Sequence, residues 1–201
     1  MNAVDLTLHA GEIHGLVGES GAGKSTVGAA IMGLLPPAGR ISAGTVALRG
    51  ERIDGVDEAG MRALRGKTLS MIFQDPLTSL NPLFTVREHL TQTMRVHLPI
   101  TAREADARAQ ALVERVGIPD AAARLDQYPH QFSGGMRQRI VIALALCAEP
   151  DVIIADEPTT ALDVAVQAQV LALIAELARE RQVAVLLITH DMGVIADTTQ
   201  R

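Results

Sequence analysis

One octapeptide restricts the fold of this chain more than any other stretch. The residues GESGAGKS, Gly18 to Ser25, match the pattern G-x-x-x-x-G-K-[ST] in full. They follow an apolar, strand-like run, EIHGLVG, and they open the helical pattern KSTVGAAIMGLL. A glycine turn that merely precedes a helix needs no Lys-Ser after its last glycine. The stretch therefore predicts a loop that binds the phosphates of a nucleotide.

Each residue type in this loop has a separate role. The glycines let the loop curl with its amides pointing inward, and Lys24 supplies a positive charge for the outer phosphates. The hydroxyl of Ser25 is suited to Mg²⁺, and Thr26 can add a phosphate contact. The predicted phosphate-binding residues are Gly18, Glu19, Ser20, Gly21, Ala22, Gly23, Lys24, Ser25 and Thr26.

Strand and helix patterns alternate along the chain. Apolar, β-branched runs recur as EIHGLVG, GTVALRG, LSMIF, DVIIAD and VAVLLITH, with helical patterns between them. Residues 76–149 contain three helical patterns and no good strand, which predicts a helical subdomain. The turn-rich segment GRISAGTVALRGERIDG predicts a small antiparallel edge. The fold class is therefore α/β: a P-loop NTPase core with a mainly parallel sheet and an inserted α-helical subdomain.

Composition excludes several classes of protein. A chain of 201 residues suffices for one core domain with a smaller insertion, and a formal charge of −5 argues against a nucleic-acid-binding face. The single cysteine, Cys147, lies in an apolar helical pattern and predicts a buried thiol rather than a disulfide. No apolar stretch reaches the roughly 20 residues that span a bilayer. The chain is expected to be soluble and not exported.

An acidic pair ends one of the predicted strands. The run DVIIADEP places Asp156 and Glu157 at the carboxyl end of a buried strand, where α/β proteins bind ligands. Asp156 is expected to hold Mg²⁺, and Glu157 to orient or polarise an attacking water. The alternative is that both acids only cap the next helix. Beside the phosphate loop, the pair indicates hydrolysis.

A second helix start in the chain is also suited to an anion. In QFSGGMRQR, Ser133 is a good N-cap, and Gly134 and Gly135 leave the first amides of the helix open. The alternative is a capped amphipathic helix with solvated arginines. One chain thus contains two anion-binding helix starts, far apart in sequence.

With its phosphate loop, FSGGMRQR and acid pair, the chain resembles the ATP-binding cassette of ABC transporters. The three motifs also follow one another in the same order as in that family. The resemblance covers nearly the whole chain and implies ATP and Mg²⁺ as cofactors. It implies that Gln74 in MIFQDP senses Mg²⁺, that Asp163 in TALD belongs to the nucleotide site, and that His190 contacts the terminal phosphate. Taken alone, Gln74 and His190 read as surface residues. In the family, two cassettes meet head to tail, so Ser133, Gly134 and Gly135 would serve ATP on a partner's phosphate loop.

The segments MIFQDPLTSLNPLFTV and YPHQFSGGMRQR look most like the dipeptide, oligopeptide and nickel importer branch. This implies a second ATPase subunit, membrane permease subunits, an extracytoplasmic binding protein and a peripheral position on the cytoplasmic face of the membrane. A RecA-like core is expected from 1–75 and 150–201. Two departures stand out: the first 17 residues contain no Phe, Tyr or Trp to stack on adenine, and the chain stops at IADTTQR. The single cassette domain is therefore expected to be incomplete at both ends.

Three other functions remain open at this point. A non-transport cassette in DNA repair or on the ribosome would share every catalytic motif, although such proteins usually carry two cassettes or long coiled coils. A P-loop kinase would lack SGGMRQR and would need a pocket for a phosphate acceptor. A pure nucleotide-binding module would not need Glu157.

Overall fold

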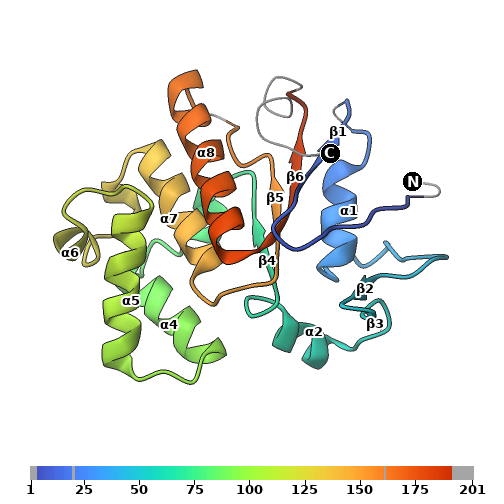
Figure 1. Ribbon diagram of the computed structural model, residues 1–201, viewed down its shortest axis with the longest axis horizontal. Coiled ribbons are helices and arrows are strands. Elements are labelled where there is room, and N and C mark those ends of the chain that lie inside the picture. Colours follow the sequence, from blue (N-terminus) through green and yellow to red (C-terminus); the bar gives the residue numbers. More distant parts are fainter. Residues whose placement is uncertain (1–3, 20, 161, 192–201) are drawn as a thin grey trace.

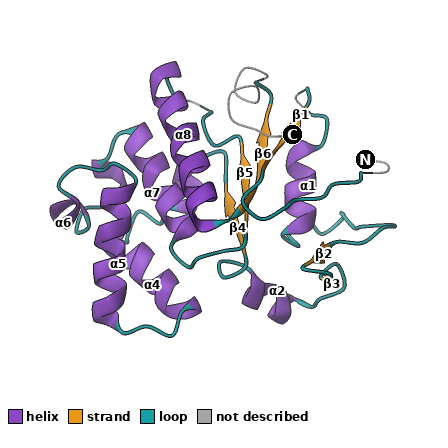
Figure 2. Cartoon of the chain, in the orientation of Figure 1, coloured by secondary structure: helices purple, strands orange, loops and turns teal. Residues whose placement is uncertain are grey.

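The computed structural model describes residues 4–19, 21–160 and 162–191. Its centre is a four-stranded parallel sheet in the order β1-β6-β5-β4. The strands are β1 (Ile13–Val17), β4 (Leu69–Ile72), β5 (Val152–Asp156) and β6 (Ala184–Thr189). Figure 2 shows them as one layer with helices on both sides. The predicted parallel α/β core is confirmed.

The two central strands are apolar on both faces because helices cover both. All six residues of β6 are buried, and successive residues face opposite layers. Val185 and Leu187 belong to the larger apolar cluster, which includes α7 and α8, whereas Leu186 and Ile188 belong to the smaller cluster on the other face. Continuous Val, Ile and Leu runs therefore become central strands.

Helices of different origin cover the two faces (Figure 1). Helix α1 (Lys24–Ile31) lies on one side, together with α2 (Glu58–Leu64). Helices α7 (Gly134–Leu146) and α8 (Val164–Arg181) lie on the other. Helix α7 is buried over most of its length, as its nearly unbroken apolar run requires.

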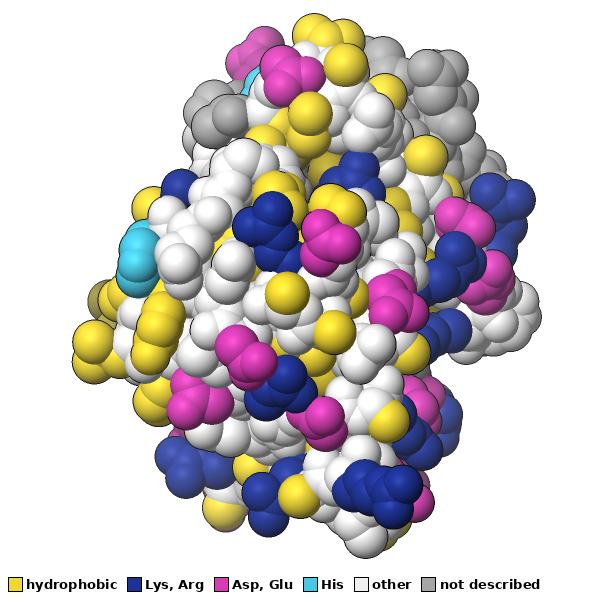
Figure 3. All heavy atoms as spheres, turned by 90° about the vertical axis from the view of Figure 1, so that its left-hand side faces the viewer, with side chains coloured by type: hydrophobic (Ala, Val, Ile, Leu, Met, Phe, Trp, Pro, Cys, Tyr) yellow, Lys and Arg dark blue, Asp and Glu magenta, His cyan; other side chains and the backbone are white. Residues whose placement is uncertain are grey.

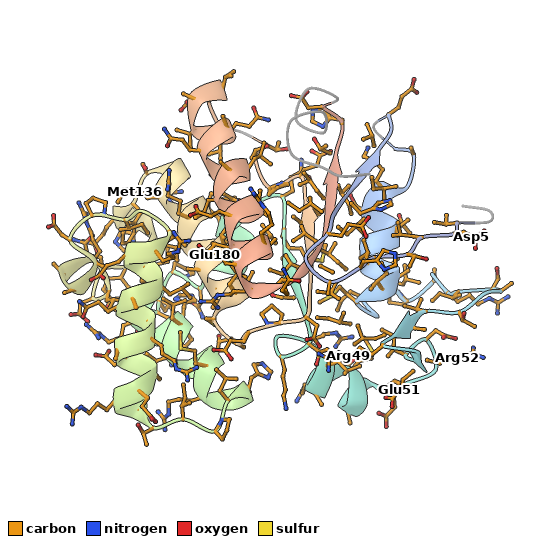
Figure 4. The ribbon with its side chains drawn as sticks, in the orientation of Figure 1. Asp5, Arg49, Glu51, Arg52, Met136 and Glu180 are labelled. Carbon is orange, nitrogen blue, oxygen red and sulfur yellow. The ribbon has the colours of Figure 1, made fainter. Side chains whose placement is uncertain are left out.

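Residues 76–146 contain helices only, among the described part of the chain. They are α3 (Pro76–Ser79), α4 (Val86–His97), α5 (Ala102–Arg115), α6 (Ala121–Arg124), the 3₁₀ helix η1 (Pro129–Gln131) and α7. Thr85 and Thr101 close capping boxes with Glu88 and Glu104 at the starts of α4 and α5. Arg115 of α5 pairs with Glu176 and Glu180 of α8, the latter labelled in Figure 4. These ion pairs therefore connect the helical segment to α8, which covers one face of the sheet.

The outer face of the helical segment mixes both signs of charge. In Figure 3, Lys and Arg side chains alternate with Asp and Glu side chains. None of the helices in the described residues has the length and apolar content to cross a bilayer.

The segment predicted to form a small antiparallel edge is a separate two-stranded sheet and, in the part of the chain that the structure describes, does not join the main sheet. Strands β2 (Ala47–Leu48) and β3 (Glu51–Arg52) pair only with each other in the described residues. Arg49, Glu51 and Arg52, labelled in Figure 4, mark this hairpin near α2. Arg49 and Gly50 both adopt the left-handed conformation that a tight hairpin turn needs. The hairpin covers the α1 side of the molecule rather than extending the main sheet.

Candidate functional site

The phosphate loop follows β1 and leads into α1, as its sequence predicts. Gly21 and Gly23 have φ of 82° and 91°, a region in which side chains are strained. The loop wraps around Lys24, whose side chain is buried and whose Nζ donates to the carbonyls of Gly18 (2.8 Å) and Glu19 (3.0 Å). Ser20 lies outside the described residues. The loop therefore holds an ammonium group at its centre.

The start of α1 is open to a ligand. Its N-cap is Gly23, no side chain caps the first turn, and that turn carries no acidic residue. Thr26 is exposed in the same turn. A helix start without a side-chain acceptor leaves amide donors for an anion, and the helix dipole favours negative charge there.

A close approach to the sheet fixes the position of α1. A Cβ at Gly28 would lie 3.0 Å from Ile154 Cγ2 and 3.4 Å from Ile188 Cδ1. Only glycine lets the helix come this near to β5 and β6. The helix start is thereby brought next to the carboxyl end of β5.

The first acid of the pair lies beside the phosphate loop. Ser25 Oγ donates to Asp156 Oδ1 at 2.9 Å, across 131 residues of sequence. Burial raises the pKa of Asp156 above its usual range, while the bond from Ser25 and the charge of Lys24 act in the opposite direction. A hydroxyl and a carboxylate are hard oxygen ligands of the kind that Mg²⁺ prefers. The donor set therefore fits this ion.

The second acid faces different partners. The Oε2 atom of Glu157 accepts hydrogen bonds from Gln74 Nε2 (3.1 Å) and Thr160 Oγ1 (2.9 Å), and its Oε1 lies 3.1 Å from His190 Nδ1. Burial raises the pKa of Glu157, but the bonds from His190 and Thr160 outweigh it and leave the pKa below its usual range. A carboxylate held ionised in this way orients a water better than it removes a proton.

The backbone at Glu157 explains how adjacent acids face different partners. Its φ is 47°, the left-handed region that non-glycine residues rarely adopt, and its N–H donates to Ile188 O at 2.9 Å. Such conformations persist only where the surroundings impose them, and they cluster at functional sites. The turn separates the carboxylate of Asp156, at the Ser25 side, from that of Glu157, beside Gln74 and His190.

Gln74 lies with the second acid rather than with the predicted metal ligands. It follows β4, and its side-chain amide donates to Glu157 Oε2. Three chain segments that follow β4, β5 and β6 thus meet at Glu157. The sequence did not single out the hydroxyl of Thr160 as a partner of this acid. Its position three residues after Glu157, in a turn, was the available signal.

The second helix start is built differently. Ser133 caps α7, its Oγ accepting from the Met136 amide at 3.3 Å, and both Ser133 and Gly134 are exposed. Figure 4 labels Met136 in this first turn, on the opposite side of the sheet from α1. The two predicted anion sites therefore do not close on one ligand within this chain.

Asp163 lies beside α7 rather than at the phosphate loop. It is the N-cap of α8, and its Oδ1 accepts from the Val166 amide at 2.9 Å. A Cβ at Gly135 would meet Val166 Cγ1 at 2.8 Å, so the first turns of α7 and α8 touch. Ala161, in the same predicted loop, lies outside the described residues. Asp163 and the Ser133 helix start thus form one exposed region.

Comparison with known proteins agrees with this architecture. The ABC transporter family pattern matches residues 1–160. The chain therefore belongs to the ABC transporter family. It is 48% identical over its whole length to the dipeptide transport ATP-binding protein DppD of Bacillus subtilis. It is also 48% identical, over 98% of its length, to the oligopeptide transport ATP-binding protein OppD of Salmonella typhimurium. The chain spans 60% and 58% of the lengths of these two relatives.

Solved structures show the same fold. The ATP-binding cassette MJ0796, in a dimeric post-hydrolysis state bound to ADP and Pi, superposes with a TM-score of 0.82. The match has 28% identity and covers 95% of this chain and 80% of that one. The cbiO1 protein of Clostridium perfringens, part of an ABC transporter complex, has a TM-score of 0.81 and 26% identity. That match covers 98% of this chain and 74% of the other.

Proposed function

We propose that this chain is the ATP-hydrolysing subunit of an ABC importer for peptides, with nickel or other small solutes as a further option. The observation that carries this proposal is the hydrogen bond from Ser25 to Asp156, which brings the phosphate loop around Lys24 beside the acid pair at the carboxyl edge of a parallel sheet. This edge is where α/β proteins bind nucleotides.

The residues divide the work by position. Lys24 exchanges the carbonyls of Gly18 and Glu19 for phosphate oxygens, and the open start of α1 adds backbone amides. Ser25 and Asp156 hold Mg²⁺, which supplies neutralisation of phosphate charge when bound. We expect Gln74, whose amide lies beside Glu157, to join them in sensing the metal.

Glu157 handles the attacking water. Its ionised carboxylate accepts from several donors and orients a water for in-line attack on the terminal phosphate. His190, whose ring lies 3.1 Å from Glu157, contacts that phosphate from the neighbouring strand. Its side chain is 60% exposed, so a ligand can reach it. This assignment makes Glu157 and His190, with Gln74, the catalytic group.

The exposed start of α7 serves a second copy of the cassette. Ser133, Gly134, Gly135 and Asp163 form one region on the opposite side of the sheet from α1, so they face a partner's nucleotide. Enclosing the transferred phosphoryl group from both sides excludes water and stabilises charge that develops on it. The dimeric neighbour bound to ADP and Pi supports this pairing.

Membrane subunits complete the importer. The relatives are named for dipeptide and oligopeptide transport, which supports permease partners and, indirectly, an extracytoplasmic solute-binding protein. The segment around and after Gln74, residues 73–84, exposes apolar side chains, an arrangement typical of an interaction site; they are Phe73, Leu77, Leu83 and Phe84. The helical subdomain, residues 76–149, would carry this surface and hold the cassette peripherally on the cytoplasmic face of the membrane.

The test is phosphate release from MgATP at rising protein concentration. Specific activity should climb as copies pair, and Ser133→Arg should abolish it by filling the exposed helix start. Glu157→Gln should bind nucleotide without turnover. Specific activity that stays constant with concentration and is unchanged by Ser133→Arg would make hydrolysis a single-chain property and overturn the proposed pairing of two cassettes. Assembly with the membrane subunits is then measured by co-purification and by swapping residues 73–84.

A further inference from the structure

His89 is a buried polar side chain on the inner side of an exposed turn. It lies in the first turn of α4 and is 8% exposed, whereas residues 81–84, which lie before this helix, are exposed. Both ring nitrogens bond to the backbone beside this turn. The Asn81 N–H donates to Nε2 at 2.9 Å, and Nδ1 lies 2.8 Å from the carbonyl oxygen of Thr85. With both nitrogens bonded, neither is available for a metal ion or for proton transfer.

The two partners fix the protonation state of the His89 ring. A carbonyl oxygen only accepts, so Nδ1 carries the proton and donates to Thr85. A backbone N–H only donates, so Nε2 is the bare acceptor for Asn81. The neutral ring with its proton on Nδ1 is therefore the form that makes both bonds. The Thr85 carbonyl also accepts from the His89 N–H at 3.1 Å, whereas the Asn81 N–H bonds to the ring alone in the described residues, so the turn depends on Nε2.

Asn81 organises the turn from its first residue. Its Oδ1 accepts from the Leu83 N–H at 3.0 Å, and its carbonyl oxygen accepts from the Phe84 N–H at 3.1 Å. Asn side chains close turns in this way because they bond to the backbone two residues on. The Phe84 ring meets the His89 ring edge-on, with centroids 5.8 Å apart and planes at 71°. One imidazole therefore holds the first residue of the turn by a hydrogen bond and the last by a ring contact.

The Asn81–Phe84 turn presents apolar side chains outward. Leu83 is 79% exposed and Phe84 is 38% exposed, although Leu80 and Val86 on either side are buried. Exposed apolar groups on an ordered backbone bind a partner at a lower entropic cost than the same groups on a mobile loop. His89, being buried, orders this backbone without contacting the partner itself.

We infer that His89 is the positioning residue for permease docking: its Nε2 holds the Asn81–Phe84 turn in the shape that receives a permease subunit. This step rests on the proposed function, which assigns residues 73–84 to the permease surface. The occupant is an apolar face of a permease subunit, because the turn offers Leu83 and Phe84 and contains no charged side chain.

Two variants at the same position separate the two ring nitrogens. The amide of His89→Gln reaches as far as Nε2, and its oxygen can accept from the Asn81 N–H. The amide of His89→Asn is one bond shorter, so it reaches only as far as Nδ1 and can donate to the Thr85 carbonyl. Gln should therefore keep the turn and Asn should release it, although both side chains are neutral and polar. Urea unfolding checks that both variants are folded under the assay conditions.

Amide exchange measures the turn directly. The Asn81 N–H should exchange roughly three- to tenfold faster in His89→Asn than in the parent, as one lost hydrogen bond implies, and at nearly the parental rate in His89→Gln. Nitrogen NMR of the parent should find the ring proton of His89 on Nδ1, with its resonances identified by their absence from His89→Gln. A ring proton on Nε2, or equal exchange in the two variants, overturns the inference.

Docking is measured in the assembled transporter. The tagged chain, expressed with its permease subunits, should retain roughly three- to tenfold less permease as His89→Asn than as the parent, and His89→Gln should retain the parental amount. Leu83→Ala should reduce retention in the parent but add little in His89→Asn, where the turn is already released. Equal retention by the Asn and Gln variants overturns the inference.

The proposed function has a separate outcome in the same experiment. A parent chain that retains no permease subunit contradicts the import function, and the docking role of His89 fails with it. A parent that retains permease, together with a His89→Asn variant that retains as much, overturns the role of His89 alone. The two failures are therefore distinguishable.

Discussion

The two helix starts of this protein, at α1 and at α7, differ in how they are completed. At α1 the cap is a glycine without a side-chain acceptor, and the neighbouring Lys24 is buried with its ammonium on the loop carbonyls. At α7 the cap is Ser133, which bonds its own helix, and the surrounding residues are exposed. The loop before the start of α1 surrounds a lysine of the same chain, and we call this the enclosed start although Ser25 and Thr26 in its first turn are exposed. The second, the outward start, has only its serine cap.

The packing behind the two helices differs as well. Gly28 lets α1 lie against β5 and β6, which brings Ser25 to Asp156. Gly135 lets α7 lie against Val166 at the start of α8, which brings Ser133 near Asp163. The first close approach brings together the groups that we propose hold phosphate and metal. The second forms the exposed region that we propose faces a second copy.

The largest expected effect comes from removing the positive charge of Lys24 at the start of α1, where α7 has Gly134. Lys24→Ala should lower nucleotide affinity and turnover by at least about 100-fold, because a charge-assisted phosphate contact in a dry loop is lost. Isothermal titration with MgATP measures the affinity of the unpaired chain. Lys67, the only other lysine, is exposed, and Lys67→Ala is the matched control. Equal losses from both variants would mean that general charge, rather than the loop, holds the nucleotide.

The sequence predicted the enclosed start better than the outward one. The loop at Gly18–Ser25 is local, and its glycines, lysine and serine carry the geometry themselves. The central strands followed from short, unbroken runs rich in Val and Ile, which are typical of strands buried on both faces. Short-range patterns were sufficient for both.

What the sequence did not reveal depends on long-range contacts. The left-handed conformation of Glu157 arises from the sheet around it, and its bonds to Gln74 and His190 join residues far apart in the chain. Helix α2 was missed because its seven residues are too few for a clear apolar period. The contact between His89 and Asn81 depends on a turn that propensities do not specify.

The next effect concerns the packing of the outward start. Gly135→Ala should destabilise the protein by about 1–3 kcal/mol, because its Cβ would meet Val166 at 2.8 Å and a valine has few other rotamers. Gly134→Ala is the control, since its Cβ would lie 3.9 Å from Leu162, an ordinary contact. Urea unfolding measures both. If Gly134→Ala proves the more costly, the start of α7 is not seated on α8 as described.

A smaller effect tests whether Ser133 at the start of α7 acts only as a helix cap or also takes part in turnover. Ser133→Ala should cost about 1 kcal/mol of stability, because the Met136 amide loses its acceptor. Thr101→Ala, at the N-cap of α5, should cost a similar amount. Only Ser133→Ala should also lower turnover at a temperature where both variants are folded. Equal turnover in the Ser133→Ala and Thr101→Ala variants would mean that Ser133 acts only as a helix cap.

The smallest effect tests how the far end of α1 is fastened. Arg65 donates to the carbonyls of Met32 and Gly33 at the end of this helix and pairs with Glu58 of α2. The hydrogen bond from Arg65 lowers the pKa of the Glu58 carboxyl, and burial opposes it. The folded protein therefore binds this proton less tightly than the unfolded chain does. The stabilisation from the pair is present above the ordinary pKa of glutamate and is lost as the pH falls through the lowered value.

Glu58→Gln should accordingly shift the urea midpoint slightly downward at neutral pH, by less than Ser133→Ala does, and the difference should close in acid. The effect is small because Glu58 is exposed, where ion pairs contribute little. Arg65→Met should cost more at every pH, since it also leaves the two helix-end carbonyls without this donor. A midpoint difference that persists unchanged in acid would show that Glu58 acts through packing, and that α1 is held at its far end by the carbonyl contacts of Arg65 alone.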